Sequence, residues 1–181
     1  MKKLIALLMA LTVLLSMAAC AKNQADPTNS TPAADTQNTE NTANTENNGE
    51  AATPAKQLTE QFRTLVQTET DVEVLAQTLI TDESIPFMGS SVPVEPGFLN
   101  GFTDEITGFV KGAQFGPNIG SIPYIGYVFE LENAEGAEAF MEMLKSKANL
   151  RWNVCTQADE MVAEAQGNLV LFAMCPLTFE E

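Results

Sequence analysis

The chain has 181 residues, of which 24 are acidic and 9 basic, and its net charge at pH 7 is −15. Nucleic acids and anionic lipid headgroups are bound by clustered lysines and arginines, so this charge argues against either as a ligand. The absence of histidine excludes Ser-His-Asp and Cys-His nucleophile systems, histidine-ligated zinc and histidine general bases within the chain.

The first residues have the pattern of an export signal. Lys2 and Lys3 form a basic start, and the apolar run from Leu4 to Leu15 is too short to span a membrane. We therefore expect residues 1–19 to be a signal peptide that directs the rest of the chain out of the cytoplasm.

The end of this run resembles the lipobox of bacterial lipoprotein precursors. Ala18 and Ala19 are the small residues that precede an invariant cysteine, here Cys20, although Met17 stands where leucine is usual. The resemblance implies that Cys20 becomes a lipidated N-terminus, which anchors the protein in the cell membrane on its extracytoplasmic side. The alternative is a secretory signal cut after Ala19, which leaves Cys20 as a free thiol.

Residues 20–56 hold this cysteine and a spacer rich in Asn, Thr, Ala, Gln, Pro and Glu. The spacer has no aromatic residue and no aliphatic one larger than alanine. It cannot bury enough apolar surface to offset the entropy cost of ordering, so we expect a disordered linker that holds the domain away from the membrane. This arrangement is common in Gram-positive bacteria, so the expected location is the cell surface of such an organism.

Residues 57–181 are expected to form a single globular domain that opens with two helices. The first has a stripe of Leu58, Phe62, Leu65 and Val66 at helical spacing. The second is indicated by a capping box at 70–73, Thr-Asp-Val-Glu. Its expected buried face is Val72, Leu75, Ala76 and Leu79.

The stretch 84–123 holds seven of the eleven glycines and five of the nine prolines. The spacing of its aromatic residues predicts a short helix around 98–107, and any strand through Val92 and Val94 is expected at a sheet edge because prolines surround it. Gly108, Gly112, Gly116 and Gly120 recur every four residues. No Gly-Lys-Ser or Gly-Lys-Thr follows, which favours turns over a phosphate-binding loop.

Regular structure is predicted more strongly after Pro123. Aromatic and β-branched residues at 123–131 predict a central strand, and Asn133 is suited to cap a helix over 134–149. Residues 161–166 and 169–175 flank Gly167-Asn168, which predicts a β-hairpin. In that register one face packs against the helix, namely Met161, Ala163, Ala165, Val170, Phe172 and Met174.

This order of strand, helix and hairpin, with Leu169-Val170-Leu171-Phe172 in the last strand, resembles an uncharacterised domain of lipoproteins from anaerobic Gram-positive bacteria. The resemblance covers about residues 71–175. It implies an α+β fold in which helices pack on a small antiparallel sheet and the chain ends in a helix followed by a β-hairpin. It implies no activity and no functional residue.

Candidate functional residues fall in two regions. Arg151 beside Trp152, the only tryptophan, can anchor a partner or a sugar ring, or Trp152 can simply cover one end of the core. The glycine- and proline-rich segment offers aromatic and sulfur side chains for recognition, which can equally seal the core beneath long loops. These residues are Phe87, Met88, Phe98, Phe102 and Phe115.

The acidic residues and cysteines give weaker indications. The pairs Asp104-Glu105 and Asp159-Glu160 and the group Glu130, Glu132 and Glu135 lack metal-site spacing and are typical of solvated turns. No motif indicates a cofactor. With Cys20 lipidated, Cys155 and Cys175 are left as a possible disulfide, although the hairpin register places Cys155 before the paired strands.

Two functions from different classes remain open. The first is a membrane-anchored, non-enzymatic lipoprotein that binds an extracellular protein, peptide or cell-wall ligand. The alternative is an extracytoplasmic hydrolase or carbohydrate-active accessory protein that uses carboxylates. A cleft with two acids within reach of each other would favour the alternative, and a flat apolar patch of several hundred Å² near residues 87–127 would favour the first. The oligomeric state is left open.

Overall fold

The computed structural model describes residues 52–179. The expectations for residues 1–51, including the export signal and the lipidation of Cys20, lie outside the described residues. The elements in chain order are helices α1 (Pro54–Leu65) and α2 (Val72–Ile80), strands β1 (Gly89–Val94), β2 (Lys111–Pro117) and β3 (Ile125–Glu130), a 3-10 turn η1 (Ala134–Gly136), helix α3 (Ala137–Lys147), and strands β4 (Glu160–Gln166) and β5 (Leu169–Cys175).

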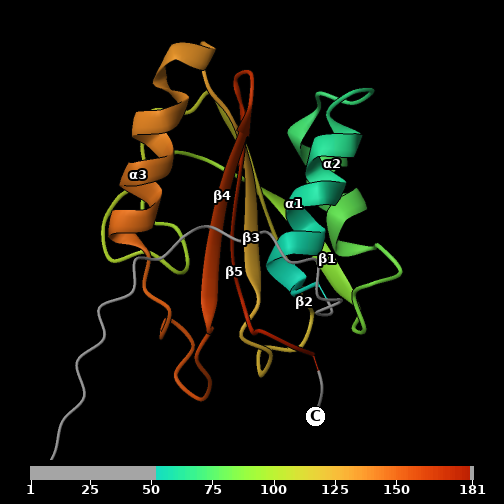
Figure 1. The fold of residues 1–181 in the computed structure, drawn as a ribbon. Helices are drawn as coiled ribbons and strands as arrows, with labels where there is room; N and C mark the ends of the chain where they lie inside the picture. The colour runs from blue at the N-terminus through green and yellow to red at the C-terminus, as the bar shows by residue number, and fades with distance from the viewer. Residues whose placement is uncertain (1–51, 180–181) are drawn as a thin grey trace, which may run out of the picture. The chain divides into compact units, whose positions relative to one another are not determined.

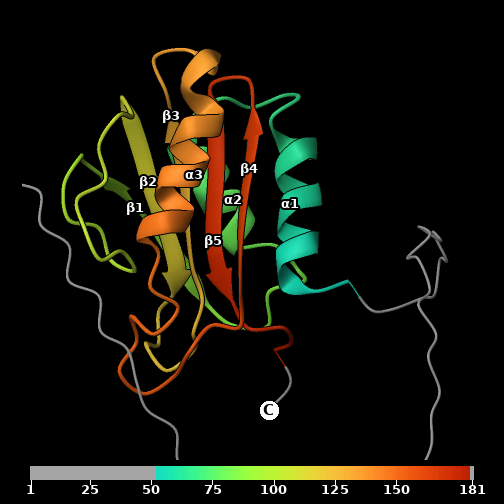
Figure 2. The same cartoon turned by 60° about the vertical axis from the view of Figure 1, so that its left-hand side comes forward.

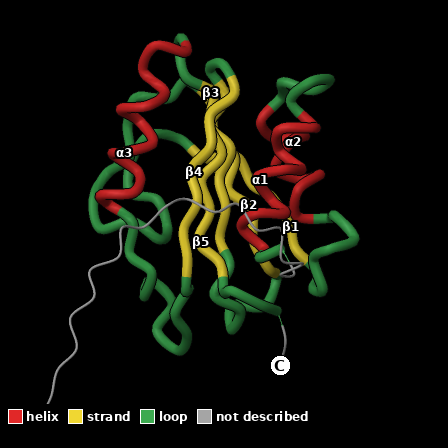
Figure 3. The backbone as a smooth tube through the Cα atoms, viewed as in Figure 1, coloured by secondary structure: helices red, strands yellow, loops and turns green. Residues whose placement is uncertain are grey.

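The five strands form one antiparallel sheet in the order β1-β2-β3-β5-β4. After β3 the chain crosses through α3 to the far edge, where it forms β4, and β5 then returns between β4 and β3 (Figure 1). The tube drawing in Figure 3 shows the sheet between α3 on one side and α1 with α2 on the other. The predicted α+β fold, with helices on an antiparallel sheet and a hairpin after the last helix, is confirmed.

The sheet separates two hydrophobic cores, because successive side chains of a strand point to opposite faces. The core between the sheet and helices α1 and α2 includes Phe62, Phe115 and Val128, and the core between the sheet and α3 includes Tyr127, Phe129 and Phe172. Figure 2 shows α3 in front of the sheet and α2 behind it. The central position predicted for the strand at 123–131 is confirmed, since every side chain of β3 except that of Glu130 is buried.

The two opening helices form as predicted, with two differences at their starts. Helix α1 begins at Pro54, before the expected domain start at residue 57, because Thr53 caps it and proline suits a first turn. Ala55 is buried, so the end of the expected linker belongs to the fold. Helix α2 is capped by Asp71, which accepts hydrogen bonds from the amides of Glu73 and Val74, and not by Thr70.

Helix α3 and the hairpin agree closely with their sequence patterns. Asn133 accepts a hydrogen bond from the amide of Glu135 and so caps the 3-10 turn that leads into α3. The turn between β4 and β5 is Gly167-Asn168, with Gly167 at φ 63°. The predicted register is confirmed, because Met161 pairs with Met174, Ala163 with Phe172 and Ala165 with Val170. These residues pack in the core beneath α3.

The segment 84–123 differs most from expectation. The helix predicted around 98–107 is wrong: this stretch is a loop in which Gly97 bridges Ile106 and Phe102 bridges Ala148. Gly101 and Gly108 have φ of 90° and 95°, which a right-handed helix cannot contain. The edge position predicted for the strand through Val92 and Val94 is confirmed as β1.

Strand β2 was not predicted, because two of its glycines fell in the series assigned to turns. Gly112 lies in the strand because its neighbours leave no room for a side chain: a Cβ there would lie 2.9 Å from Val94 and 3.1 Å from Phe129. Gly116 is also in β2, whereas Gly108 and Gly120 lie in loops. Among residues 52–179 no helix has the length and apolar character needed to cross a membrane.

Candidate functional site

The five side chains proposed for recognition in the middle segment do not form one surface. Phe115 is fully buried beneath α1 and α2, and Phe87 packs edge-to-face on Tyr124 in the same layer. Phe102 lies beneath α3, with its ring 5.1 Å from that of Phe172. Met88 and Phe98 are 82% and 76% exposed. The alternative, that phenylalanines seal the core under loops, holds for Phe87 and Phe102, whereas Phe115 packs in the core from β2.

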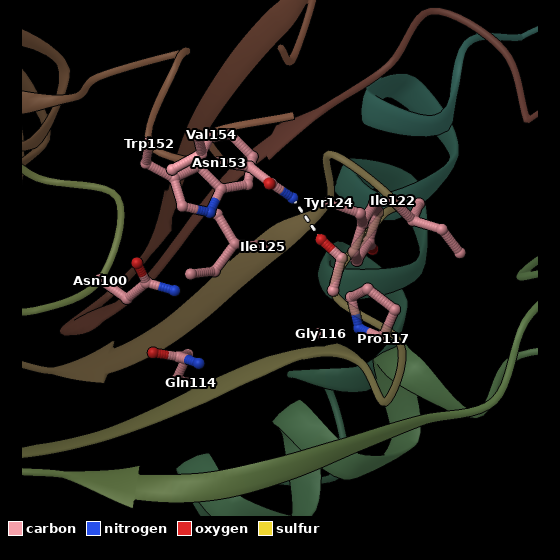
Figure 4. Close-up of a pocket in the computed structure, with 11 residues that line it drawn as sticks. Asn100, Gln114, Gly116, Pro117, Ile122, Tyr124, Ile125, Trp152, Asn153 and Val154 are labelled. Carbon is pink, nitrogen blue, oxygen red and sulfur yellow. Dashed lines mark hydrogen bonds between the residues drawn. The ribbon is translucent and has the colours of Figure 1, made fainter. Parts of the chain in front are cut away.

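The other candidate, Arg151-Trp152-Asn153, lies in the loop between α3 and β4 and borders a pocket. Trp152 and Asn153 line a hollow of about 340 Å³, together with Asn100, Gln114 and Ile125 (Figure 4). This volume is near the lower end of the range for small-molecule sites, roughly 300–1,000 Å³. Arg151 is exposed and is not part of the lining.

Three loops form this pocket on the α3 side of the sheet, at the end where α3 stops. The loop after β1 contributes Asn100, the β2–β3 connection contributes Gly120 and Ile122, and the loop after α3 contributes Trp152, Asn153 and Val154. The sheet contributes Gln114 from β2 and Ile125 from β3, and side-chain alternation places both on the α3 face with Tyr127. Residues far apart in sequence therefore meet here.

Hydrogen bonds hold the first of these loops against α3. The amide of Thr103 donates to the carbonyl of Lys147 at 2.9 Å, and the amide of Asn149 donates to the carbonyl of Gly101 at 2.9 Å. The Lys147 ammonium donates to the carbonyl of Glu105. These bonds satisfy a carbonyl at the end of α3 that the helix itself leaves unpaired, and they fix the loop that carries Asn100.

Asn153 holds the second wall in place. Its side-chain amide donates to the carbonyl of Gly120, the contact drawn as a dashed line in Figure 4. Its side-chain oxygen accepts from the amide of Cys155 at 3.4 Å. Asn153 therefore joins the β2–β3 connection to the loop after α3, and both ends of its side chain are already engaged within the protein.

Tyr127 orients the groups beneath the pocket. Its hydroxyl donates to the backbone carbonyl of Asn100 at 2.5 Å and also lies 2.9 Å from the side-chain amide of Gln114. A phenol has one hydrogen, so the hydroxyl donates to only one of these two oxygens at a time. The Gln114 oxygen faces the hydroxyl, and its NH₂ group has no hydrogen-bond partner within residues 52–179. Burial raises the pKa of Tyr127, so its hydroxyl remains protonated at ordinary pH.

The groups left for a ligand are uncharged. The Asn100 side chain and the Trp152 indole N–H have no hydrogen-bond partner within residues 52–179, and Gln114 offers its second amide atom. Ile122, Ile125 and Val154 complete the lining with apolar surface. No charged side chain belongs to the described lining of this pocket. The arrangement can hold a polar ligand by hydrogen bonds and aromatic contact.

The candidate carboxylates are placed elsewhere and do not converge. Asp104 lies 3.7 Å from Lys147, and Glu130 lies 3.9 Å from Lys111. Asp159 accepts from the amide of Leu177, and Glu160 lies near the Cys175 thiol. Glu105, Glu132 and Glu135 are exposed. Within the described part of the chain, no group of three or more acids and cysteines could hold a metal ion.

Cys155 and Cys175 are both free cysteines in the structure, with Cys155 exposed and Cys175 buried. Cys175 pairs with Glu160 across the hairpin, whereas Cys155 lies in the preceding loop. Burial raises the pKa of the Cys175 thiol, and Glu160 and Asp159 raise it further. The structure therefore does not join the two residues that the sequence offered for a disulfide.

The sequence indicated Trp152 but not Asn100 or Gln114. Asn100 fell inside a predicted helix, and Gln114 fell in a stretch assigned to turns. Neither has a local signal, because each becomes part of the pocket only through the pairing of β2 with β3 and the Tyr127 hydroxyl. A polar residue between apolar neighbours in Ala113-Gln114-Phe115 is the one weak hint.

Comparisons with protein-family models, with curated proteins and with solved structures each found no match to this chain. The description of the fold therefore depends on the strand order, and that of the site depends on the geometry of its residues.

Proposed function

We propose that this protein is a membrane-anchored extracytoplasmic lipoprotein without enzymatic activity of its own, which binds an uncharged polar ligand in the Trp152 pocket. The observation that carries the proposal is the lining itself. Three carboxamide residues and an indole border one hollow, and no carboxylate, ammonium or guanidinium group belongs to its lining among the described residues. A charged ligand would lose its hydration there without gaining an opposite charge.

The ligand class that fits best is a neutral saccharide, such as a component of the cell wall. A sugar ring has an apolar face that suits the flat indole of Trp152, and hydroxyls that both donate and accept hydrogen bonds. Carboxamides can match such hydroxyls because each amide has a donor and an acceptor. The carboxylate-dependent hydrolase has no comparable support, since the candidate acids lie outside the pocket.

The anchor rests on the sequence resemblance at Cys20. A diacylated cysteine followed by a long polar spacer would hold the domain near the cell wall of a Gram-positive bacterium. The local concentration of a wall ligand around a tethered domain is high, so a modest affinity per site suffices. The acidic chain is not expected to bind nucleic acid.

Trp152 provides the test, because it is the only tryptophan and lines the pocket. Purified protein would be titrated with three trisaccharides of similar size: tri-N-acetylchitotriose, which is neutral, its deacetylated form, which is cationic, and trigalacturonate, which is anionic. We expect a saturable change in tryptophan fluorescence with the neutral sugar and a much weaker response to the charged ones.

Two matched glutamine substitutions test whether the fluorescence change comes from binding in the pocket. Gln114→Leu removes a hydrogen-bonding group from the pocket and should weaken binding by about tenfold or more. Gln157→Leu changes an exposed glutamine outside the lining and should leave binding intact. No saturable response to any neutral sugar, or equal binding by the Gln114 variant, would contradict the proposal.

A further inference from the structure

The two edge strands of the sheet, β1 and β4, differ in whether their outward backbone groups are protected. The Asn118 amide donates to the Met88 carbonyl, which makes Ser90, Val92 and Val94 the residues of β1 that hydrogen-bond to β2. The outward backbone groups of this edge therefore belong to Gly89, Ser91 and Pro93. The Ser91 amide donates to the side chain of Gln77 in α2 at 3.3 Å, and Pro93 has no N–H to offer. This edge is therefore protected against pairing with another strand.

Among the described residues, the β4 edge has unpaired outward backbone groups. The Leu131 amide donates to the Asn168 carbonyl, which fixes the alternation along β5: Val170, Phe172 and Met174 bond to β3. The other residues of β5 bond to Glu160, Val162, Glu164 and Gln166 of β4. The outward N–H and C=O groups of Met161, Ala163 and Ala165 are left without a hydrogen-bond partner within residues 52–179.

Strand β4 carries Glu160 and Glu164 on the α1 side but lacks the other usual protective devices of an edge strand. The strand contains no proline and no lysine, and its pairing with β5 is continuous from Glu160 to Gln166 without a bulge. Figure 1 shows β4 at the near edge of the sheet, between α3 and α1. On the α3 side its side chains are apolar and two of the three are small: Met161, Ala163 and Ala165.

We propose that a second copy of this chain pairs with this edge, so that β4 and its symmetry mate run antiparallel about Ala163 and the two sheets become continuous. Antiparallel pairing of identical strands has two-fold symmetry, which is the commonest symmetry of protein oligomers. Ala163 faces Ala163 of the partner subunit, and Met161 faces Ala165 of the partner subunit. All six outward N–H groups and all six outward carbonyls of the two strands are then paired.

Charge selects this register among the neighbouring ones. On the α1 side, Glu160 meets the partner's Gln166 and Val162 meets the partner's Glu164, so no two glutamates are opposed. A shift by two residues in one direction opposes Glu160 to the partner's Glu164, and a shift in the other opposes Glu164 to itself. Like charges directly opposite each other destabilise a strand pair.

The flanking helices also fit a continuous sheet. Helices α1 and α3 each pack over both β4 and β5. With strands spaced about 4.8 Å apart, each helix would lie about 10 Å from its symmetry mate. That is close to the usual distance of packed helices, about 8–10 Å. Glu164 is already paired with Arg63 of α1, with Nε to Oε1 at 2.7 Å, so it does not bring an uncompensated charge to the seam.

Disulfide trapping in membranes tests the register with the full chain in a Cys155→Ser background. Antiparallel hydrogen-bonded partners have Cα atoms about 5.5 Å apart, which permits a disulfide. Ala163→Cys should therefore give a covalent dimer. In the same register the two copies of Val162→Cys lie about 8 Å apart, beyond the usual limit. This variant and the parent chain should stay monomeric on a non-reducing gel.

A second measurement follows the mass of the full chain in excess detergent by sedimentation velocity. Wild type and Ala163→Ser should form dimers, and added salt should strengthen them by screening the acidic charge. Ala163→Pro removes an outward N–H that makes no hydrogen bond to β5, and should weaken the dimer by roughly tenfold or more. A monomeric wild type without Ala163→Cys trapping, equal trapping of Val162→Cys, or trapping of Ala163→Cys to a different protein would overturn the proposal.

Discussion

Tyr124 and Tyr127 are both buried, but only the hydroxyl of Tyr127 is hydrogen-bonded. Tyr127 donates to the Asn100 carbonyl, whereas the Tyr124 hydroxyl has no partner among the described residues. An unpaired buried hydroxyl costs free energy on folding, while a paired one is about neutral or favourable. Burial raises the pKa of both phenols.

This contrast predicts opposite effects of the same substitution. Tyr124→Phe should leave the free energy of unfolding unchanged or raise it by about 1 kcal/mol, because it removes only the unpaired hydroxyl. Tyr127→Phe should lower it by about 1–2 kcal/mol, because it leaves the Asn100 carbonyl and the Gln114 amide without their partner. Urea unfolding of both variants measures the difference. A loss of stability in Tyr124→Phe as large as that in Tyr127→Phe would contradict this interpretation.

The two free cysteines should differ in reactivity for the same reason. Cys155 is exposed and should react quickly with a thiol reagent, whereas Cys175 is buried with a raised pKa and should react only after unfolding. The Cys155→Ser variant isolates the slow thiol. Fast modification of Cys175 in the folded protein, or no reactive thiol in the wild type, would contradict the structure.

The raised pKa of Cys175 also predicts a pH dependence. Because the ordinary value is 9.0 and the folded value is higher, the unfolded chain loses this proton first as pH rises. The stability associated with the neutral thiol is therefore present below about pH 9 and is lost above it. Between about pH 8 and pH 10, the free energy of unfolding should fall less steeply in Cys175→Ala than in the wild type.

At the scale of the elements, the start of α2 provides a test of its cap. Asp71→Ala should lower the free energy of unfolding by about 1 kcal/mol, because it removes the carboxylate that accepts from Glu73 and Val74. Thr70→Ala is the matched control and should have little effect, since the Thr70 side chain is not the cap. The reverse order of effects in urea unfolding would restore the capping box predicted from sequence.

The elements that were predictable are those determined by their own residues. Helix α3 and the β4–β5 hairpin have a local stripe, a cap and a two-residue turn, and all three survive in the structure. The stretch 98–110 has helical spacing but its conformation depends on distant partners: Thr103 hydrogen-bonds to Lys147, and Phe102 bridges Ala148. Those contacts are absent from any local window.

Glycines in the strands were also hard to predict from local sequence, because distant neighbours select them. In a strand pattern glycine weakens the prediction, yet Gly126 lies in the central strand because the Phe115 ring fills the space where its Cβ would be. Gly112 is selected by a similar crowding. The pocket could not be predicted for the same reason. Gln114 reaches it only because it lies in β2, and the glycines of β2 prevented the prediction of that strand.

For the whole molecule, we propose that one part of the chain, the lipidated Cys20, attaches the protein to the membrane, and that another part, the pocket, binds the ligand. Wild-type protein expressed with its signal should partition into the detergent phase, because a diacylated Cys20 carries two long acyl chains. Cys20→Ala should not be processed to that form and should remain in the aqueous phase or as precursor. Equal partitioning of the two proteins would contradict the lipoprotein assignment without bearing on the pocket.

The central claim is that an uncharged saccharide occupies the pocket at Trp152, and NMR tests it most directly. A single tryptophan gives a single indole N–H resonance, and the Gln114 side-chain amide gives a second probe in the same hollow. On titration with tri-N-acetylchitotriose, we predict saturable shifts of both signals and none for the backbone amide of Gln77 on the opposite face of the sheet. Binding that leaves the Trp152 and Gln114 signals unmoved, or no binding of any neutral sugar, would contradict the account.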